Sequence, residues 1–270
     1  MKRSQLIGVA IACIVVVSTV SYIAFLNMPV TENHPEPPEG LYYNGVDIWF
    51  LKVMGFKMKY EDIVVYVDPA YIFTTDNDTF LEKADFIVIS HDHQTHCSPS
   101  IVRRLSDSNT LVIASQEPAL LVDANYTVES GDVLTFDKVT FEFVPSYCYN
   151  ATYYQTETPM HTRAENNTGV IIDFEGTRIY HAADTDRIPE MQSLVADIAI
   201  LPVSESPNHA WTNASEAAKV IDDLKINSDL MYAIPTHWDV GVGFITEQRQ
   251  YAEEFAELAN CTVAILDPYY

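Results

Sequence analysis

The chain has 270 residues, of which 48% are hydrophobic, and this is enough apolar sequence to bury a sizeable core in one large domain. Acidic residues outnumber basic residues by 38 to 15, which gives a formal net charge of -23. Such a charge repels nucleic acids and anionic lipid surfaces, so the composition argues against both as partners. We interpret the excess acidity as a source of solubility.

The first expected element is a single transmembrane helix at residues 6–26. This stretch carries no charged residue and follows Lys2 and Arg3, and its length suits a bilayer core of about 30 Å at about 1.5 Å per residue. A cleaved signal peptide is the alternative, but the apolar run is longer than an ordinary signal sequence and no clear cleavage site follows it. The basic end at residues 1–5 predicts a cytoplasmic N-terminus and an extracytoplasmic location for the rest of the chain.

Glycosylation sequons favour the same location. The tripeptide Asn-x-Ser/Thr starts at Asn77, Asn125, Asn150, Asn166, Asn213 and Asn260. The alternative is that several of these asparagines are ordinary polar turn residues, because the tripeptide alone does not prove glycosylation. The cysteines outside the membrane segment are Cys97, Cys148 and Cys261, an odd set that permits one disulfide and one free thiol without dictating either.

Residues 27–40 are expected to form an extended tether between the membrane helix and the rest of the chain. They are rich in proline and acidic residues, a composition that suits neither helix nor sheet. No comparable break occurs later, so we place one folded domain at residues 41–270.

Short strands dominate the first part of this domain. They are β-branched runs bounded by turn residues, at 46–53, 63–67, 86–90 and 111–114. Two hairpins are expected next, at 134–144 and 169–181. The second hairpin turns at Glu175 and Gly176, between two runs of alternating apolar residues.

Strands and helices alternate in the last part of the domain. Strands are expected at 197–202, 230–235 and 262–266, and amphipathic helices at 214–224 and 247–259. Thr212 and Asn213 are the expected caps of the first helix, and Thr246 is the expected cap of the second. Early strands followed by interleaved helices predict an α/β fold with two packed sheets and helices outside them.

The main functional signal is a cluster of histidines at the end of a strand. The apolar run 86–90 leads directly into His91, His93 and His96. A strand end is a rigid place from which a loop can aim several imidazoles at one point, and imidazole suits zinc, iron and related ions. A lone histidine here would be taken as a surface residue, but the three together predict a metal site.

Three further residues are candidates for the same site. His161 precedes the second hairpin, Asp184 follows it, and His237 follows a later strand. Each of them alone is more typical of a structural residue. Their shared placement at or near strand ends favours a common site.

These residues resemble the pattern of a known family, the metallo-β-lactamase superfamily of hydrolases. The resemblance covers nearly everything after the tether, and it extends over the consecutive runs 169–186, 188–191 and 197–202. Within the superfamily, the chain looks like the metal-dependent hydrolases related to L-ascorbate-6-phosphate lactonase. It is more distantly similar to N-acylphosphatidylethanolamine-hydrolysing phospholipase D. The resemblance implies a four-layer αββα sandwich.

The resemblance also implies a set of ligands for a divalent metal. The ligands would surround two ions: His91, His93 and His161 around the first, His96 and His237 around the second, and Asp184 as a bridge between them. Zinc is the expected metal, with manganese or iron as alternatives.

One position departs from the family pattern. The family has an aspartate immediately before the last histidine of the first motif, and this chain has Thr95 there. In the family that carboxylate binds the second ion and orients the attacking water, whereas Thr95 offers only a neutral hydroxyl. A dinuclear centre, a mononuclear centre and a degraded catalyst therefore all remain open. Asp92 is a weaker candidate to replace the missing carboxylate.

Asp68 resembles the family acid that steadies a metal ligand from behind. It follows the expected strand at 63–67 and precedes Pro69. An ordinary turn residue before proline is an equally good interpretation of this position.

The sequence thus predicts a membrane-anchored metal-dependent hydrolase in which a metal-bound hydroxide attacks an ester, lactone or phosphodiester of a small-molecule substrate. Asp184 and Thr95 are the candidate catalytic positions. Asp186, His181 and His209 are candidates for the general acid, although His181 alternates with buried strand residues and suits a packing role. The alternative is a non-catalytic surface protein that keeps the fold and a partial metal site, and Thr95 favours it. A nuclease is a weaker third option because of the net acidity.

Overall fold

Two seven-stranded sheets run through the chain from Leu41 to Val263. They are seen in a computed structural model that describes residues 39–70, 80–149, 159–204, 213–239 and 248–269. Several predicted features lie outside these residues: the membrane helix at 6–26, most of the tether at 27–40, Thr212, Thr246, His209, Asn77 and Asn150. Within the described residues, no helix combines the length and the apolar character that crossing a membrane requires.

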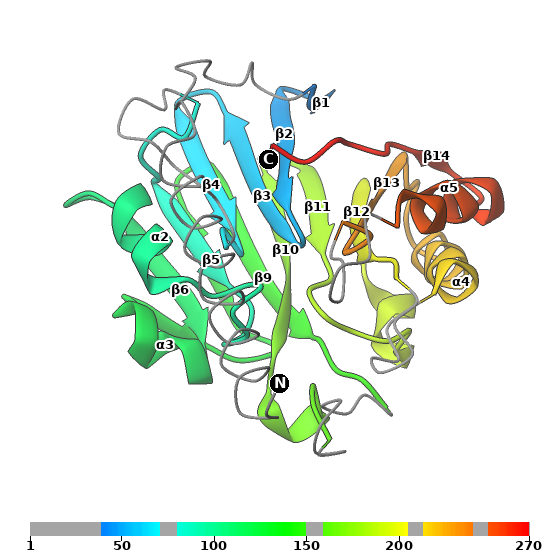
Figure 1. Ribbon diagram of the computed structural model, residues 1–270. Helices are drawn as coiled ribbons and strands as arrows, with labels where there is room; N and C mark the ends of the chain where they lie inside the picture. Colours follow the sequence, from blue (N-terminus) through cyan, green and yellow to red (C-terminus); the bar gives the residue numbers. More distant parts are fainter. Residues whose placement is uncertain (1–38, 71–79, 150–158, 205–212, 240–247, 270) are drawn as a thin grey trace, which may run out of the picture. The chain divides into compact units, whose positions relative to one another are not determined.

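The first sheet contains the first seven strands in their chain order (Figure 1). They are β1 Leu41–Tyr43, β2 Val46–Lys52, β3 Gly55–Tyr60, β4 Ile63–Val67, β5 Phe86–Ile89, β6 Leu111–Ser115 and β7 Tyr126–Val128. Strands β1 to β4 pair antiparallel, whereas β4 to β7 pair parallel. The carboxyl ends of the parallel strands therefore share one edge of the sheet.

The second sheet repeats this plan. Its strands are β8 Val133–Phe136, β9 Val139–Pro145, β10 Thr168–Phe174, β11 Thr177–His181, β12 Ile198–Pro202, β13 Tyr232–Thr236 and β14 Thr262–Val263. Strands β8 to β11 are antiparallel and β11 to β14 are parallel. The predicted turn at Glu175 and Gly176 joins β10 to β11, and its φ angles of 49° and 101° are typical of a tight hairpin turn.

Helices cover the outer faces of both sheets (Figure 1). They are α2 Pro99–Leu105 and α3 Gln116–Val122 on the first sheet, and α4 Ala214–Leu224 and α5 Arg249–Leu258 on the second. Two short 3-10 helices, η1 Arg163–Glu165 and η2 Pro189–Ser193, lie in connections. Buried side chains such as Phe50, Phe141 and Phe174 fill the space between the sheets. The predicted α/β class, with two packed sheets and outer helices, is thus confirmed.

The sequence pattern does not predict strands β1, β3 and β7 or helices α2 and α3. Strand β3 contains Lys57, a residue type that usually indicates an exposed position, yet Lys57 is only 3% exposed. Its ammonium is paired inside the protein with the Phe80 carbonyl and with Glu82. Helices α2 and α3 have seven residues each, which is too short to show a helical period.

Several element ends differ from the predictions by one to three residues. Helix α5 begins at Arg249 with Gln248 in the cap position, and Gln248 makes no side-chain cap bond. Strand β14 ends at Val263 rather than at residue 266, and the tail after it crosses to the first sheet, where the Tyr269 amide donates to the Phe50 carbonyl. By contrast, the predicted cap Asn213 is confirmed, because its side chain accepts the amide of Glu216 at 2.9 Å.

Two predicted sequons also have structural roles. The side chain of Asn125 accepts the Val112 amide at 2.7 Å, and Asn213 caps α4. These bonds suit polar turn residues, and glycosylation stays a prediction. Among the described residues, Cys97, Cys148 and Cys261 are all free thiols.

Candidate metal centre

The predicted metal ligands meet at one edge shared by the two sheets. Asp68 follows β4 and His91 follows β5 in the first sheet, while Asp184 follows β11 and His237 follows β13 in the second. His161 lies in the connection between β9 and β10. Parallel strands place their carboxyl ends together, so residues that are far apart in the chain reach one place.

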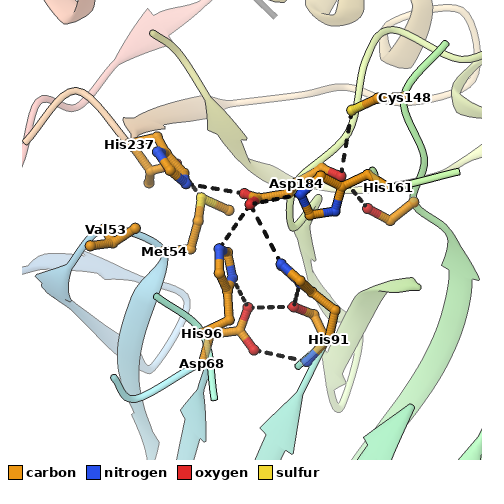
Figure 2. A network of polar contacts seen from close by, with 12 residues as sticks. Val53, Met54, Asp68, His91, His96, Cys148, His161, Asp184 and His237 are labelled. Carbon is orange, nitrogen blue, oxygen red and sulfur yellow. Dashed lines mark hydrogen bonds and ion pairs between the residues drawn. The ribbon is translucent and has the colours of Figure 1, made fainter. Parts of the chain in front are cut away.

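The carboxylate of Asp184 lies at the centre of this group (Figure 2). Its Oδ2 atom lies 3.0 Å from Nε2 of His96, 3.5 Å from Nε2 of His91 and 3.7 Å from Nε2 of His161. Its Oδ1 atom lies 3.2 Å from Nε2 of His237. The two carboxylate oxygens therefore face different histidines, as a bridging ligand would.

Besides a group of Asp68, His91 and His96, the possible ligand atoms form two groups that share Asp184. Within each group, all atoms lie within 4.8 Å of one another: His91, His93, His161 and Asp184 in one group, and His96, Asp184 and His237 in the other. This division is the one that the family resemblance implies. The structure brings every predicted ligand into place, while metal binding itself stays a prediction.

The chemistry of the donor atoms fits a cation. Within the described residues, Nε2 of His91, Nε2 of His96 and both oxygens of Asp184 are buried, and apart from the ion pairs between Asp184 and the histidines they have no hydrogen-bond partner. Burial of a polar atom without a hydrogen-bond partner costs free energy, so such atoms usually have another interaction. A divalent ion would supply it to several of them at once.

Asp68 holds two of the histidines from behind. Its Oδ2 atom lies 2.8 Å from Nδ1 of His96, and it also accepts the hydroxyl of Ser90 at 2.6 Å. The same hydroxyl lies 2.9 Å from Nδ1 of His91. Because Nδ1 of each ring is engaged on this side, Nε2 of each ring points towards Asp184. These contacts favour the ligand-steadying role of Asp68 over the role of a turn residue.

His161 has a comparable neighbour in Asn167, whose Nδ2 atom lies 3.2 Å from Nδ1 of His161. Turning the Asn167 amide by half a rotation places its oxygen there instead, where it accepts the Nδ1 proton and leaves Nε2 to a metal. Sequence reasoning missed both Ser90 and Asn167. Ser90 had a usable signal, since it stands between the strand and His91, but nothing in the sequence distinguishes Asn167 from a loop residue.

The pKa values of two ligands suit metal binding. Burial, reinforced by the nearby ring of His91, lowers the pKa of His93 to about 4 and that of His161 to about 2. Both rings are therefore neutral near pH 7, and the neutral ring is the form that binds metal.

The opposite shift occurs at His96. Burial opposes a charge on this ring, but Asp184 and then Asp68 outweigh burial and raise the pKa of His96 to about 10. Burial also opposes the charge on Asp184, yet His96 and His237 hold the pKa of Asp184 well below its usual range. The two buried carboxylates therefore favour positive charge between them, which is consistent with a cation site.

Asp92 does not replace the carboxylate that is missing at Thr95. The side chain of Asp92 is exposed, and it belongs to neither ligand group. Thr95 is half-buried in the same loop. The group of His96, Asp184 and His237 thus offers three protein ligands, so the occupancy of this second position depends on them.

The structure distinguishes two of the general-acid candidates, His181 and Asp186. His181 is fully buried, packs edge-on against Phe56, and places Nε2 2.8 Å from the Met54 carbonyl. This geometry suits the packing role. Asp186 accepts the Tyr149 amide at 2.8 Å, and burial raises the pKa of its carboxyl, which makes the protonated form more accessible. Asp186 therefore stays a candidate.

The rim of the centre near His93 is acidic. Burial, followed by the charges of Asp92 and Glu165, raises the pKa of Glu117. Arg163, two residues before Glu165 in the chain, forms an ion pair with Glu190, with 2.7 Å between the charged groups. A negative potential at the rim follows from this arrangement.

Comparison with known proteins identifies the family. A family profile described as a beta-lactamase superfamily domain matches residues 47–237, from β2 to the last predicted ligand. The chain therefore belongs to the metallo-β-lactamase superfamily, as the resemblance implied.

Within the superfamily, the chain is similar to the UPF0173 metal-dependent hydrolases. The relative from Pelotomaculum thermopropionicum is 25% identical over 195 residues, which cover 69% of this chain and 81% of the relative. The closer likeness to L-ascorbate-6-phosphate lactonase stays a prediction.

Solved structures share the fold. A crystal structure assigned to the metal-dependent hydrolases, from Parabacteroides distasonis, has 26% identity and a TM-score of 0.68, with 86% of this chain and 99% of that chain covered. Igni18, a metallo hydrolase from Ignicoccus hospitalis, has 21% identity and a TM-score of 0.60, with 83% and 95% covered. At its lower identity, the second likeness concerns the fold alone.

Proposed function

We propose that this chain is a metal-dependent hydrolase that acts on an ester, lactone or phosphodiester of a small molecule. The observation that carries the proposal is the arrangement of His91, His96, His161 and His237 around the two oxygens of Asp184. The names of the relatives support the same reaction class.

The metal supplies the reactive chemistry when it is bound: it lowers the pKa of coordinated water to about 7 and polarises the bond to be broken. The chain's residues keep the donor atoms in place. Asp68 fixes the ring of His96 directly and that of His91 through Ser90. The two rings lie at most 1% exposed, and this burial limits competition from bulk water.

Asp186 is the residue that we propose for proton transfer to the leaving group. It lies two residues after Asp184, and burial raises the pKa of its carboxyl. A raised pKa increases the fraction of protonated carboxyl that can donate a proton. The Tyr149 amide keeps the carboxylate in one orientation.

We also propose that the chain is anchored in a membrane by residues 6–26, with the hydrolase domain on the extracytoplasmic side. The uncharged apolar run behind Lys2 and Arg3 supports this topology. The full chain should then require detergent for extraction, and a version that starts at residue 39 should not. Release of the full chain by salt alone would contradict the anchor.

A non-catalytic surface protein is the competing function, and Thr95 is the observation that favours it. The purified full chain should therefore be analysed for bound metal and then tested, with zinc, manganese and iron, on lactones, phosphodiesters, carboxylic esters and β-lactams. We expect at least one ion per chain and hydrolysis of one substrate class. Less than one ion per chain, with no hydrolysis under any metal, would overturn the hydrolase proposal.

A further inference from the structure

The turn between β2 and β3 lies buried beside the metal centre instead of at the surface, where hairpin turns usually lie. Val53 is 1% exposed and Met54 is 0% exposed, and Figure 2 shows both of them on the side of the centre where His237 lies. Val53 has a φ angle of 60°. This conformation is strained for a β-branched residue, and it persists only where the surrounding structure holds it.

Residues of the second sheet supply that restraint. The His237 amide donates to the Val53 carbonyl at 2.9 Å, and the carboxylate of Asp239 accepts the Val53 amide at 2.9 Å. The ring of His181 lies 2.8 Å from the Met54 carbonyl through Nε2. The turn is thus bonded to the last residue of β11 and to the first and third residues after β13.

His237 depends on this contact for its direction. It leaves β13 with a φ angle of 65°, a conformation that side-chain-bearing residues adopt rarely, so its backbone is also held by its surroundings. The Val53 carbonyl accepts the hydrogen bond from the His237 amide. A shift of the turn would therefore move the imidazole that lies 3.2 Å from Asp184.

Asp239 is a buried carboxylate whose described contacts centre on this turn. It is 6% exposed, and within the described residues its Oδ1 atom is buried without a hydrogen-bond partner. A carboxylate buried in this way costs stability. Among the described residues, the carboxylate's hydrogen bond to another part of the chain is the one that it accepts from the Val53 amide.

We propose that Asp239 is a positioning residue for the metal centre: by holding the Val53 amide, it keeps the Val53 carbonyl against the His237 amide and so aims the His237 imidazole at Asp184. This inference rests on the proposed metal site. It adds two positions, Val53 and Asp239, to the residues that determine metal affinity.

The test compares three variants of the full chain. Asp239→Ala removes the acceptor, Asp239→Asn keeps an oxygen acceptor without the charge, and Asp197→Ala is the matched control. Asp197 also accepts a backbone amide, that of Arg178 at 2.8 Å, but it precedes β12 at the opposite end of the second sheet. Metal affinity is measured by titration with cobalt(II), whose absorption spectrum reports the number and type of ligands.

We expect Asp239→Ala to weaken the binding of the ion that uses His237 by about 10- to 100-fold and to change its cobalt spectrum. Asp239→Asn should restore affinity to within about threefold, and Asp197→Ala should leave both affinity and spectrum unchanged. Equal affinities for Asp239→Ala and Asp197→Ala would overturn the inference. If Asp239→Ala does not fold, Asp239→Glu misplaces the acceptor by one methylene group, and unchanged affinity in that variant would overturn the inference equally.

A second measurement separates this inference from the proposed function. A wild-type chain that binds no metal would overturn the metal site. The positioning role of Asp239 is then tested by amide hydrogen exchange at Val53 and His237 in the metal-free protein. We expect faster exchange at both amides in Asp239→Ala but not in Asp197→Ala. Unchanged exchange in Asp239→Ala would overturn the positioning role of Asp239.

Discussion

The carboxylate of Asp68 lies 2.8 Å from Nδ1 of His96, on the opposite side of the ring from Asp184. Asp68 therefore steadies a predicted ligand from the side that faces away from Asp184. Asp68→Ala would leave the Ser90 amide and the Nδ1 proton of His96 buried without their acceptor. We expect it to weaken metal binding by about 10- to 100-fold and to lower the free energy of unfolding by about 1–3 kcal/mol. Metal titration and denaturant unfolding measure the two effects. An affinity equal to that of the wild type would exclude this role.

Restoring the missing carboxylate should strengthen the second metal position. Thr95→Asp adds an anionic oxygen next to His96, so we expect more of the second ion to be bound per chain. Thr95→Asn has nearly the same shape without the charge and is the control. Elemental analysis after dialysis against limiting metal gives the stoichiometry. If Thr95→Asp binds no more metal than Thr95→Asn, the assignment of position 95 is wrong.

The stability of the metal-free chain should depend on pH in two opposite ways. The pKa of His93 is lowered to about 4 and that of His161 to about 2, so below about pH 6.5 the unfolded chain binds protons that the folded chain does not. Stability should therefore fall as the pH decreases through this range, by at most about 1.4 kcal/mol per pH unit for each ring.

His96 acts in the other direction, because its pKa is raised to about 10. Its contribution to stability is complete below about pH 6.5 and is lost as the pH rises towards about 10. Denaturant unfolding across the acidic and alkaline ranges should show that the free energy of unfolding is highest near neutral pH. His96→Gln should flatten the alkaline side, and His161→Gln should reduce the acidic slope. A profile that neither substitution changes would contradict the shifts.

The acidic rim should discriminate among substrates by charge. Asp92, Glu117 and Glu165 repel an anionic substrate, and salt screens that repulsion over a Debye length of about 10 Å at about 0.1 M. We expect kcat/KM for an anionic ester to rise with ionic strength, while that of a neutral ester stays constant. Glu117→Gln should reduce the salt effect, and Glu254→Gln, on the exposed face of α5, should not. Equal salt dependence for both esters would argue against the rim.

The strained turn permits a test of its own. Val53 lies in the left-handed region of backbone conformation, which costs glycine less free energy than a residue with a side chain. Val53→Ala and Val53→Gly both remove the buried side chain, yet we expect the glycine variant to be more stable than the alanine variant by about 1 kcal/mol. In an extended strand the order would be reversed. Denaturant midpoints of the two variants decide the matter.

Much of the fold and of the ligand set could be predicted because these features depend on local sequence patterns. Strand 63–67 and helix 214–224 have the predicted bounds, and His91, His93 and His96 are signalled by their spacing. Residues whose role depends on distant partners were not predictable. Lys57 lies inside the protein only because Phe80 and Glu82 meet it there, and Asn167 matters only because His161 lies beside it. The Val53 turn supports His237 across a separation of 184 positions that no local pattern reveals.

The two sheets contribute different donors to one centre. Asp68, His91, His93 and His96 come from the first half of the chain, whereas His161, Asp184 and His237 come from the second. An ion bound among them would join the halves as a cross-link does, without a covalent bond. Its binding energy would then add to the cohesion of the whole domain, because an unfolded chain holds no such array of donors. Chelation should consequently lower the melting temperature, and the availability of metal would set how long the chain stays folded.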